Sequence, residues 1–542
     1  MTGHDLMAKI LKAEGVEHIF AFPMQSLIDT GAKIGITPII CRQERAGVNM
    51  ADGLSRVTNG KKLGVFTMQQ GPGAENAFGG VAQSYADSVP ILHLPGGEPL
   101  SKQGIKPTFS AVPNYLHITK WAAQIHSIED IPAMVRRAII QMKSGHMGPV
   151  LLEMPSDLFR GEAPDLPYTP VTIRKSMAAT DDVKDLVTAL LKAKNPVICA
   201  GHGVLWAEAT ADLIEFAELT KIPVMTSMAG KSAFPENHPL ALGAGGLTRP
   251  LMVTRFLENA DFVLGIGTSF TRNTFTTPMP DDVIIGMVTN CAEDIGKDYE
   301  AQYGAVGDAQ LVLRQMIEEV KSQTSADGRE DTTGVADRVA AVTREFETMW
   351  EPHFTTDETP ISPYRVLREL YNGVDVANTI ITHDSGYPRD QFVPMWKTLS
   401  PRGYLSWGKS TQLGFGLGLA IGAKIGAPDK QVINVMGDAA FGMAGLDLET
   451  SVRANAPILT VVLNNGVMTK YDSHMPNATE RYDSNQLAGN YAAIGAALGA
   501  HAERVDNPAD LPAAIKRATD ANKDGQAALL EVMTKAEPNV SR

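Results

Sequence analysis

The chain has 542 residues and a formal charge of −13, and 44% of its residues are hydrophobic while 20% are charged. This length predicts several domains, and the acidic balance argues against nonspecific binding to nucleic acid or acidic membranes. No apolar run reaches the ~18 residues that a membrane span needs. Residues 1–14 are polar and amphipathic rather than signal-like, so we expect a cytoplasmic protein without nucleic-acid or membrane partners.

The three cysteines, Cys41, Cys199 and Cys291, are far apart in the chain and lie beside apolar residues. Their spacing fits no metal or redox motif. We therefore expect three buried free thiols.

Strand-like and helix-like segments alternate along the whole chain in three blocks. The first block, 1–170, contains the apolar runs 65–68, 89–92 and 150–152, and the second, 182–320, contains 197–200, 222–225, 262–265 and 283–286. Residues 321–359 are interpreted as a polar linker followed by a helix that precedes the third block, which spans 360–542. Repeated β-α alternation predicts an α/β protein with three tandem doubly wound domains, each a parallel sheet covered by helices on both faces.

The most informative pattern lies in the third block. The apolar run 432–436 leads into Gly437-Asp438-Ala439-Ala440, and the next apolar run, 459–463, is followed by a pair of asparagines that ends at Asn465. The ends of neighbouring parallel strands hold ligands in such folds. Asp438 and Asn465 offer oxygen ligands that suit Mg²⁺, while the small residues let backbone N–H groups approach a phosphate. The alternative is an ordinary turn with a helix cap.

These motifs resemble the diphosphate and metal signature of thiamine diphosphate enzymes, in which Gly-Asp-Gly is followed by Asn-Asn; Ala439 replaces the second glycine of that family. Residues 42–56, which include Glu44, resemble the glutamate segment of the acetolactate synthase branch. Residues 71–76, Gly-Pro-Gly-Ala-Glu-Asn, are similar to the Gly-Pro-Gly-Ala-Thr-Asn of that branch. The resemblance covers nearly the entire chain and implies a pyrimidine-binding, a middle and a diphosphate-binding domain, in that order.

On sequence alone, Glu44 fits a helix-capping acid. The resemblance implies instead that Glu44 is catalytic and hydrogen-bonds the aminopyrimidine ring of thiamine diphosphate, which promotes loss of the thiazolium proton. The resemblance also implies a Mg²⁺ site made by Asp438, Asn465 and the Val467 carbonyl. The further cofactor-binding positions that it implies are Ser385, Gly386, Tyr387, Thr411, Leu413, Gly437, Ala439 and Ala440. In this family the glutamate and the diphosphate site come from different subunits, so a homodimer or homotetramer with a shared active site is expected.

Residues for substrate contact are less clearly marked. Gln25, Gln70, His117 and Glu480 are candidates, and each fits a turn or surface residue as well. The middle domain holds FAD in acetolactate synthases, and ADP or coenzyme A in oxalyl-CoA decarboxylases and 2-hydroxyacyl-CoA lyases, whereas pyruvate decarboxylases lack such a ligand. The segments 201–203 and 265–269 and the acid Asp294 are suitable places for FAD or ADP.

The expected activity is cleavage or formation of a C–C bond next to a carbonyl. The first hypothesis is acetolactate synthase-like decarboxylation and carboligation of a small 2-oxo acid. The alternative is a 2-hydroxyacyl-CoA lyase or oxalyl-CoA decarboxylase acting on an acyl-CoA thioester. A non-catalytic nucleotide-binding homologue is a second alternative, and the presence of Glu44, Asp438 and Asn465 argues against it.

Overall fold

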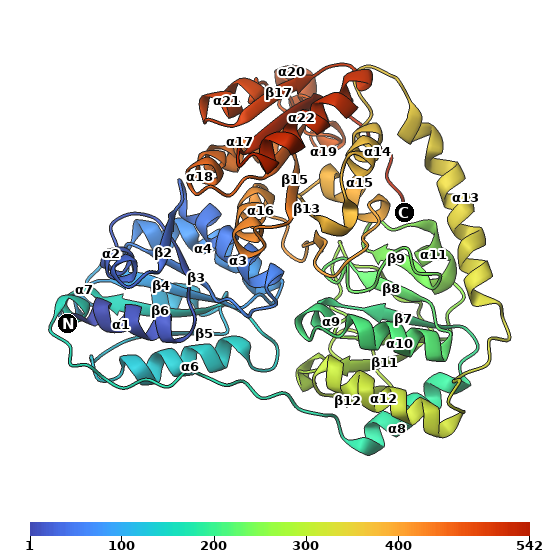
Figure 1. Cartoon of the computed structure of the whole chain (residues 1–542), viewed down its shortest axis with the longest axis horizontal. Helices are drawn as coiled ribbons and strands as arrows, with labels where there is room; N and C mark the ends of the chain where they lie inside the picture. The colour runs from blue at the N-terminus through green and yellow to red at the C-terminus, as the bar shows by residue number, and fades with distance from the viewer.

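The computed structural model describes residues 1–542 and contains three six-stranded sheets, one in each third of the chain (Figure 1). Every strand pairs with its neighbours in parallel, and helices cover the sheets. The expected α/β class with three tandem doubly wound domains is confirmed. No helix is both long and apolar enough to cross a membrane.

The first domain has the strand order β2-β1-β3-β4-β6-β5. Its strands are β1 (His18–Ala21), β2 (Thr37–Ile40), β3 (Gly64–Met68), β4 (Ile91–Gly97), β5 (Trp121–Gln124) and β6 (Val150–Pro155). Its helices are α1 (Gly3–Ala13), α2 (Ser26–Lys33), α3 (Glu44–Val57), α4 (Pro72–Ala86), α5 (Ala111–Tyr115), α6 (Ile131–Lys143) and α7 (Ser156–Arg160). The central strands β3, β4 and β6 are buried along their whole length, as their continuous apolar runs predict.

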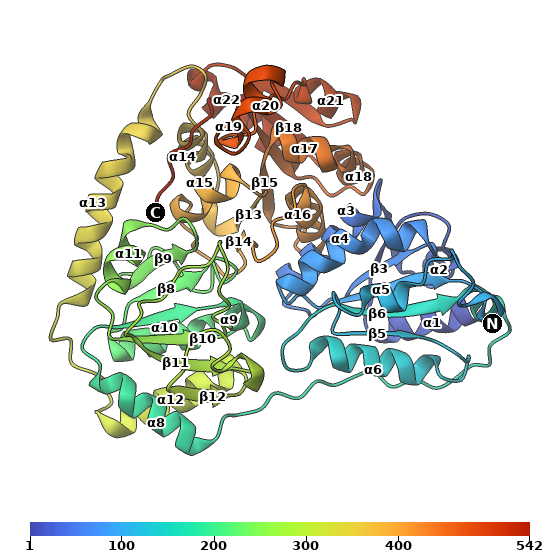
Figure 2. The same cartoon turned by 180° about the vertical axis from the view of Figure 1, so that it is seen from behind.

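An extended segment leads from α7 to the middle domain, whose strand order is β12-β11-β10-β7-β8-β9 (Figure 1). Its strands are β7 (Pro196–Ala200), β8 (Val224–Ser227), β9 (Ala241–Gly245), β10 (Phe262–Ile266), β11 (Ile284–Thr289) and β12 (Tyr303–Val306). Its helices are α8 (Thr180–Lys192), α9 (His202–Trp206), α10 (Thr210–Thr220), α11 (Leu251–Leu257), the 3₁₀ turn η2 (Ala292–Asp294) and α12 (Ala309–Gln323). The long helix α13 (Val335–Thr355) then runs along the outside of the molecule toward the third domain (Figure 2).

The third domain has the order β14-β13-β15-β16-β18-β17. Its strands are β13 (Thr379–His383), β14 (Tyr404–Leu405), β15 (Gln431–Gly437), β16 (Leu459–Asn464), β17 (His501–Val505) and β18 (Ala528–Met533). Its helices are α14 (Pro363–Gly373), α15 (Tyr387–Met395), α16 (Phe415–Gly426), α17 (Asp438–Ala444), the 3₁₀ turn η4 (Gly445–Asp447), α18 (Leu448–Arg453), α19 (Tyr471–His474), α20 (Pro476–Tyr482), α21 (Tyr491–Ala497) and α22 (Leu511–Lys523).

The first and third domains meet where α3 packs on α16, and the two helices share one hydrophobic cluster. Small residues make this approach possible: an added Cβ at Gly53 would overlap the Leu419 carbonyl oxygen, and one at Gly422 would overlap the Met50 carbonyl oxygen. Two helix backbones therefore touch across the domain boundary, and only glycine fits at these crossing points.

Candidate functional site

The carboxyl ends of β15 and β16 form the centre of the predicted metal and diphosphate site. The two strands pair in parallel, with Gly437 beside Leu463, so Asp438 lies next to the loop that follows β16. The Asp438 carboxylate is 4% exposed and accepts hydrogen bonds from the N–H groups of Ala439 at 2.8 Å and Gly466 at 2.9 Å. Burial raises the pKa of Asp438, and these N–H groups oppose that rise.

The loop after β16 orients the amide of Asn465. Its Oδ1 accepts a hydrogen bond from the Val467 N–H at 3.0 Å, and its Nδ2 donates to Thr469 Oγ1 at 3.0 Å. Asp438, Asn465 and Val467 therefore lie close together after two neighbouring strands, and they bring a carboxylate, a side-chain amide and a backbone carbonyl to this region. This donor set fits Mg²⁺, which takes hard oxygen ligands and keeps several waters or phosphate oxygens.

Open space lies over three glycines of the third domain, of which Gly386 and Gly437 are at this edge and Gly442 is one turn into α17. An added Cβ at Gly386 or Gly442 would meet nothing within 4 Å, and the atom nearest to one at Gly437 is Pro388 Cγ at 3.9 Å. Gly386 has a φ of +82° and lies between Ser385 and Tyr387, the residue that begins α15. The backbone at this edge leaves room for a diphosphate near the N-termini of α15 and α17.

Asp384, which our sequence analysis did not select, ties this edge together. Its buried carboxylate accepts hydrogen bonds from the N–H groups of Ser385 at 2.8 Å, Gly414 at 2.9 Å and Gly416 at 3.0 Å. Burial raises its pKa to about 6, although the three N–H groups and the nearby Arg45 charge oppose that rise. Asp384 thus connects the end of β13 to the start of α16 and fixes the loop that contains the half-buried Thr411 and Leu413.

Glu44 begins α3 and is 3% exposed. Its carboxylate accepts a hydrogen bond from Asn76 Nδ2 at 3.2 Å. Its neighbours reach the third domain of the same chain: the Arg42 N–H donates to Asp447 Oδ1 at 2.8 Å, and Arg45 Nη2 donates to the Met443 carbonyl at 3.4 Å. The Glu44 carboxylate itself forms no hydrogen bond with the Asp438 loop.

Two of the four candidate substrate residues lie together. Gln25 is buried after β1, and its Oε1 lies 3.0 Å from His4 Nε2. An added Cβ at Gly96 would lie 3.1 Å from Gln25 Nε2 and 3.2 Å from the Gln70 backbone nitrogen, which places both glutamines at one sheet edge. His117, after α5, and Glu480, on α20, have exposed side chains outside this group.

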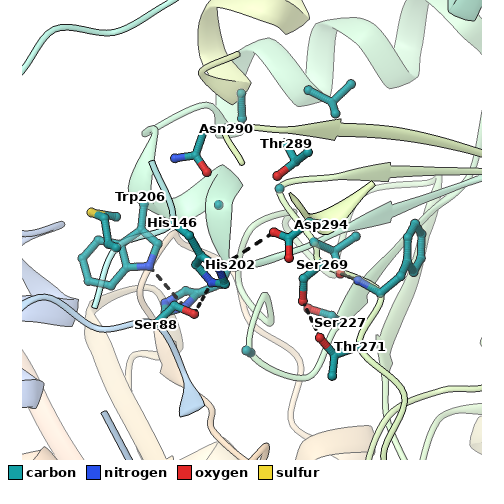
Figure 3. A pocket seen from close by; sticks show the side chains of 18 of the residues that line it. Ser88, His146, His202, Trp206, Ser227, Ser269, Thr271, Thr289, Asn290 and Asp294 are labelled. Atoms are coloured by element: carbon teal, nitrogen blue, oxygen red, sulfur yellow. Dashed lines mark hydrogen bonds and ion pairs between the residues drawn. The ribbon is translucent and has the colours of Figure 1, made fainter. Parts of the chain in front are cut away.

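A cavity of about 330 Å³ lies at the carboxyl ends of the middle sheet (Figure 3). The segments 201–203 and 265–269 and Asp294 were expected to be suitable for a nucleotide, and residues 202–203, 267–269 and Asp294 line this cavity. The cavity wall also includes residues from the other two domains, among them His146 from the first and Lys409 from the third. Lys409 Nζ donates to Ser269 Oγ at 3.3 Å, and further cations line the wall: Lys143, Arg174 and Lys175.

The burial of one cysteine differs from the sequence analysis. Cys41 and Cys199 are buried as expected, but Cys291 is only partly buried. It lies between the end of β11 and η2, in a loop at the edge of the middle sheet, because the apolar strand ends at Thr289.

Three parallel-sheet domains, an acid-and-amide cluster at one sheet edge and a buried glutamate at another are the features by which the chain can be compared with known enzymes. The models of the thiamine pyrophosphate enzyme N-terminal TPP binding, central and C-terminal TPP binding domains match residues 1–124, 183–316 and 384–532. The chain belongs to the thiamine pyrophosphate enzyme family, and the resemblance found in the sequence is confirmed.

Curated relatives match over nearly their whole length. The chain is 30% identical to a probable acetolactate synthase large subunit of Methanocaldococcus jannaschii, covering 96% of this chain and 90% of the relative. It is 27% identical to the acetolactate synthase isozyme 3 large subunit of Escherichia coli, covering 100% and 96%. The crystal structure of benzoylformate decarboxylase from Polynucleobacter necessarius superposes with a TM-score of 0.83 at 19% identity, covering 99% of both chains, which supports the fold.

Proposed function

We propose that the protein is a thiamine diphosphate- and Mg²⁺-dependent enzyme that decarboxylates a small 2-oxo acid and joins the product to a second carbonyl compound, as acetolactate synthases do. The observation that carries this proposal is the placement of Asp438, Asn465 and Val467 together after β15 and β16, next to the open backbone at Gly437. The acetolactate synthase relatives support the choice of a 2-oxo acid.

Each side chain has a definite task in this proposal. Asp438, Asn465 and the Val467 carbonyl would hold Mg²⁺ against the diphosphate, with backbone N–H groups of 437–440 and 385–387 around the phosphate oxygens. Leu413 would support the bent cofactor, and the Thr411 carbonyl would accept from its aminopyrimidine. Glu44 would hold a proton at the pyrimidine ring nitrogen. Bound thiamine diphosphate supplies a carbon nucleophile and an electron sink for the bond that breaks.

The site is proposed to be shared between two copies of the chain. Apolar side chains stay exposed on α4, where they are Phe78 and Tyr85, and on α17 and η4, where they are Met443 and Leu446. A two-fold interface would bury these side chains. The same interface would bring Glu44 of one copy to the diphosphate edge of the other copy.

The middle-domain cavity is proposed to take the adenosine diphosphate group that FAD, ADP and coenzyme A have in common. The lysine and arginine side chains in its wall complement a diphosphate. The absorbance and mass of the ligand that co-purifies distinguish the three. A flavin spectrum identifies FAD. If there is no flavin spectrum, the mass of the bound ligand identifies ADP or coenzyme A.

The activity is tested with purified protein, thiamine diphosphate and Mg²⁺. We expect pyruvate or another small 2-oxo acid to release CO₂ and form a C–C bonded product, with activity lost in a chelator and restored by Mg²⁺. Turnover of oxalyl-CoA or a 2-hydroxyacyl-CoA, without turnover of any 2-oxo acid, would assign the thioester reaction instead. Absence of turnover with both substrate classes would overturn the proposal.

A further inference from the structure

Two loops from different domains meet at the rim of the middle-domain cavity. The loop between α6 and β6 carries His146, and the turn after β11 carries Cys291 and Asp294. Their potential ligand atoms, an imidazole nitrogen, a thiol sulfur and a carboxylate oxygen, all lie within 4.8 Å of one another. We propose that these three side chains form a Zn²⁺ site that joins the first domain to the middle domain.

The spacing of the three groups suits a small ion. His146 Nδ1 lies 3.9 Å from Asp294 Oδ2, and Figure 3 shows the two side chains facing each other. Zinc bonds of about 2.0–2.3 Å in a tetrahedral site place neighbouring ligands about 3.3–3.8 Å apart. Side-chain adjustments of about 1 Å therefore bring all three donors onto one ion.

The two loops are already joined next to the ligands. Asn290 Nδ2, one residue before Cys291, donates to the carbonyl of Gly145, one residue before His146, at 2.8 Å. The Asp294 N–H donates to the Cys291 carbonyl at 3.1 Å and closes the turn that puts thiol and carboxylate on the same side. The backbone positions of the ligands are thus fixed before an ion binds.

Neighbouring side chains contact the atoms of His146 and Asp294 that would not bind the ion. The Ser88 hydroxyl contacts Nε2 of His146, which leaves Nδ1 directed at the cluster. Lys297 Nζ donates to Asp294 Oδ1 at 2.9 Å, which leaves Oδ2 on the side of His146. Partners of this kind orient histidine and carboxylate ligands in metal sites. Lys297 also offsets one of the two negative charges that the thiolate and carboxylate bring.

The donor set selects the metal. One imidazole, one thiolate and one carboxylate suit Zn²⁺, whereas Mg²⁺ and Ca²⁺ favour oxygen ligands alone. His146 and Asp294 both line the cavity, so the fourth position of the ion opens toward it and takes water or a cavity ligand. The sequence does not reveal this set because its histidine and cysteine are 145 residues apart and belong to different domains.

Cobalt(II) tests the proposal because its bond to a thiolate gives a charge-transfer absorption band that oxygen ligands do not produce. The full-length enzyme is treated with a chelator, dialysed and titrated with Co²⁺, with Mg²⁺ and thiamine diphosphate present at saturation. We expect the band to saturate at about one Co²⁺ per chain and to disappear when Zn²⁺ is added. Co²⁺ at the Asp438 site has only oxygen ligands, so it does not contribute to the band.

Cys291→Ser should abolish the band, and His146→Gln and Asp294→Asn should each weaken Co²⁺ binding at least tenfold. Glu293→Gln and His126→Gln, which change exposed residues outside the cluster, should leave binding unchanged. Thermal unfolding of the metal-free variants checks that they fold as the parent protein does. A parent enzyme without the band, or a band that persists in Cys291→Ser, overturns the assignment. The assignment is also overturned if the control variants lose Co²⁺ binding as much as the His146 and Asp294 variants do.

Discussion

Gly53 on α3 and the Leu419 carbonyl on α16 are in direct contact, so that no methyl group fits between the first and third domains at this point. Gly53→Ala should therefore force the helices apart and lower the free energy of unfolding by about 1–3 kcal/mol, the usual cost of overpacking a buried site. Urea unfolding measures the change. Gly442→Ala is the matched control, since an added Cβ there meets nothing within 4 Å. Equal stability of Gly53→Ala and the parent would contradict this account of the helix contact.

Glu44→Gln keeps the size of the side chain and its hydrogen-bonding capacity toward Asn76 but removes the acid. Positioned acid–base groups raise reaction rates by about 10²–10⁴-fold, so kcat should fall at least 10²-fold in this variant. The fold and the affinity for thiamine diphosphate should change little. Steady-state turnover and cofactor titration measure both quantities. Glu75→Gln, an exposed acid in the first turn of α4, should keep the parent rate. Retained turnover in Glu44→Gln would exclude the role proposed for Glu44.

Mixing two inactive variants tests whether the site is shared between subunits. Glu44→Gln supplies an intact diphosphate site, and Asp438→Asn supplies an intact glutamate. Random exchange in a dimer with shared sites restores about one quarter of the native sites, because each mixed dimer contains one native pair. Activity is measured after dissociation and reassociation of equal amounts. If both groups of a site came from one chain, the mixture would be as inactive as its components.

Asp384→Ala leaves the N–H groups of Ser385, Gly414 and Gly416 without their acceptor in a buried region. Each unsatisfied group costs about 1–3 kcal/mol, so the loop that carries Thr411 and Leu413 should lose its fixed position. We expect the thiamine diphosphate concentration at half-maximal activity to rise at least tenfold. Asp384→Asn, which keeps one acceptor oxygen, should lie between the parent and the alanine variant. An unchanged cofactor dependence in Asp384→Ala would show that the loop holds its position without this carboxylate.

Two buried histidines should make the fold sensitive to acid. Burial lowers the pKa of His93 and of His383 to about 3, while an unfolded histidine titrates near 6.5. Between these values the unfolded chain binds protons that the folded chain excludes. Stability is therefore retained above pH ~6.5 and falls as pH decreases toward 3, by up to about 1.4 kcal/mol per pH unit for each histidine.

Both ring nitrogens of His93 lack hydrogen-bond partners, so His93→Phe removes the titration without breaking a bond. Urea unfolding at pH 7, 6 and 5 should show a smaller pH slope in this variant than in the parent. The exposed His126→Phe variant should keep the parent slope. If the stability of His93→Phe depended on pH as steeply as that of the parent, the acid sensitivity would come from other groups.

The sequence predicted the three-domain fold because buried parallel strands leave continuous apolar runs such as β3 and β16. The positions of Asp438 and Asn465 at strand ends were also predictable, since each directly follows such a run. Asp384 was not, because its importance depends on hydrogen bonds to Gly414 and Gly416, about thirty residues later. The cavity wall was only partly predictable: its glycine segments follow strands, but His146 and Lys409 reach it from other domains.

The contact between α3 and α16 has a consequence for how the chain acquires its structure during synthesis. Residues of α3 from Ala46 to Arg56 are buried in the finished protein, in part by a helix that begins only at Phe415. At ~5–20 residues per second, a ribosome needs roughly 20–70 s to reach α16 after completing α3. Throughout that interval the first domain exposes the side of α3 that α16 later covers. Nascent first domains are therefore natural clients for chaperones, and truncated chains that end before α16 should aggregate.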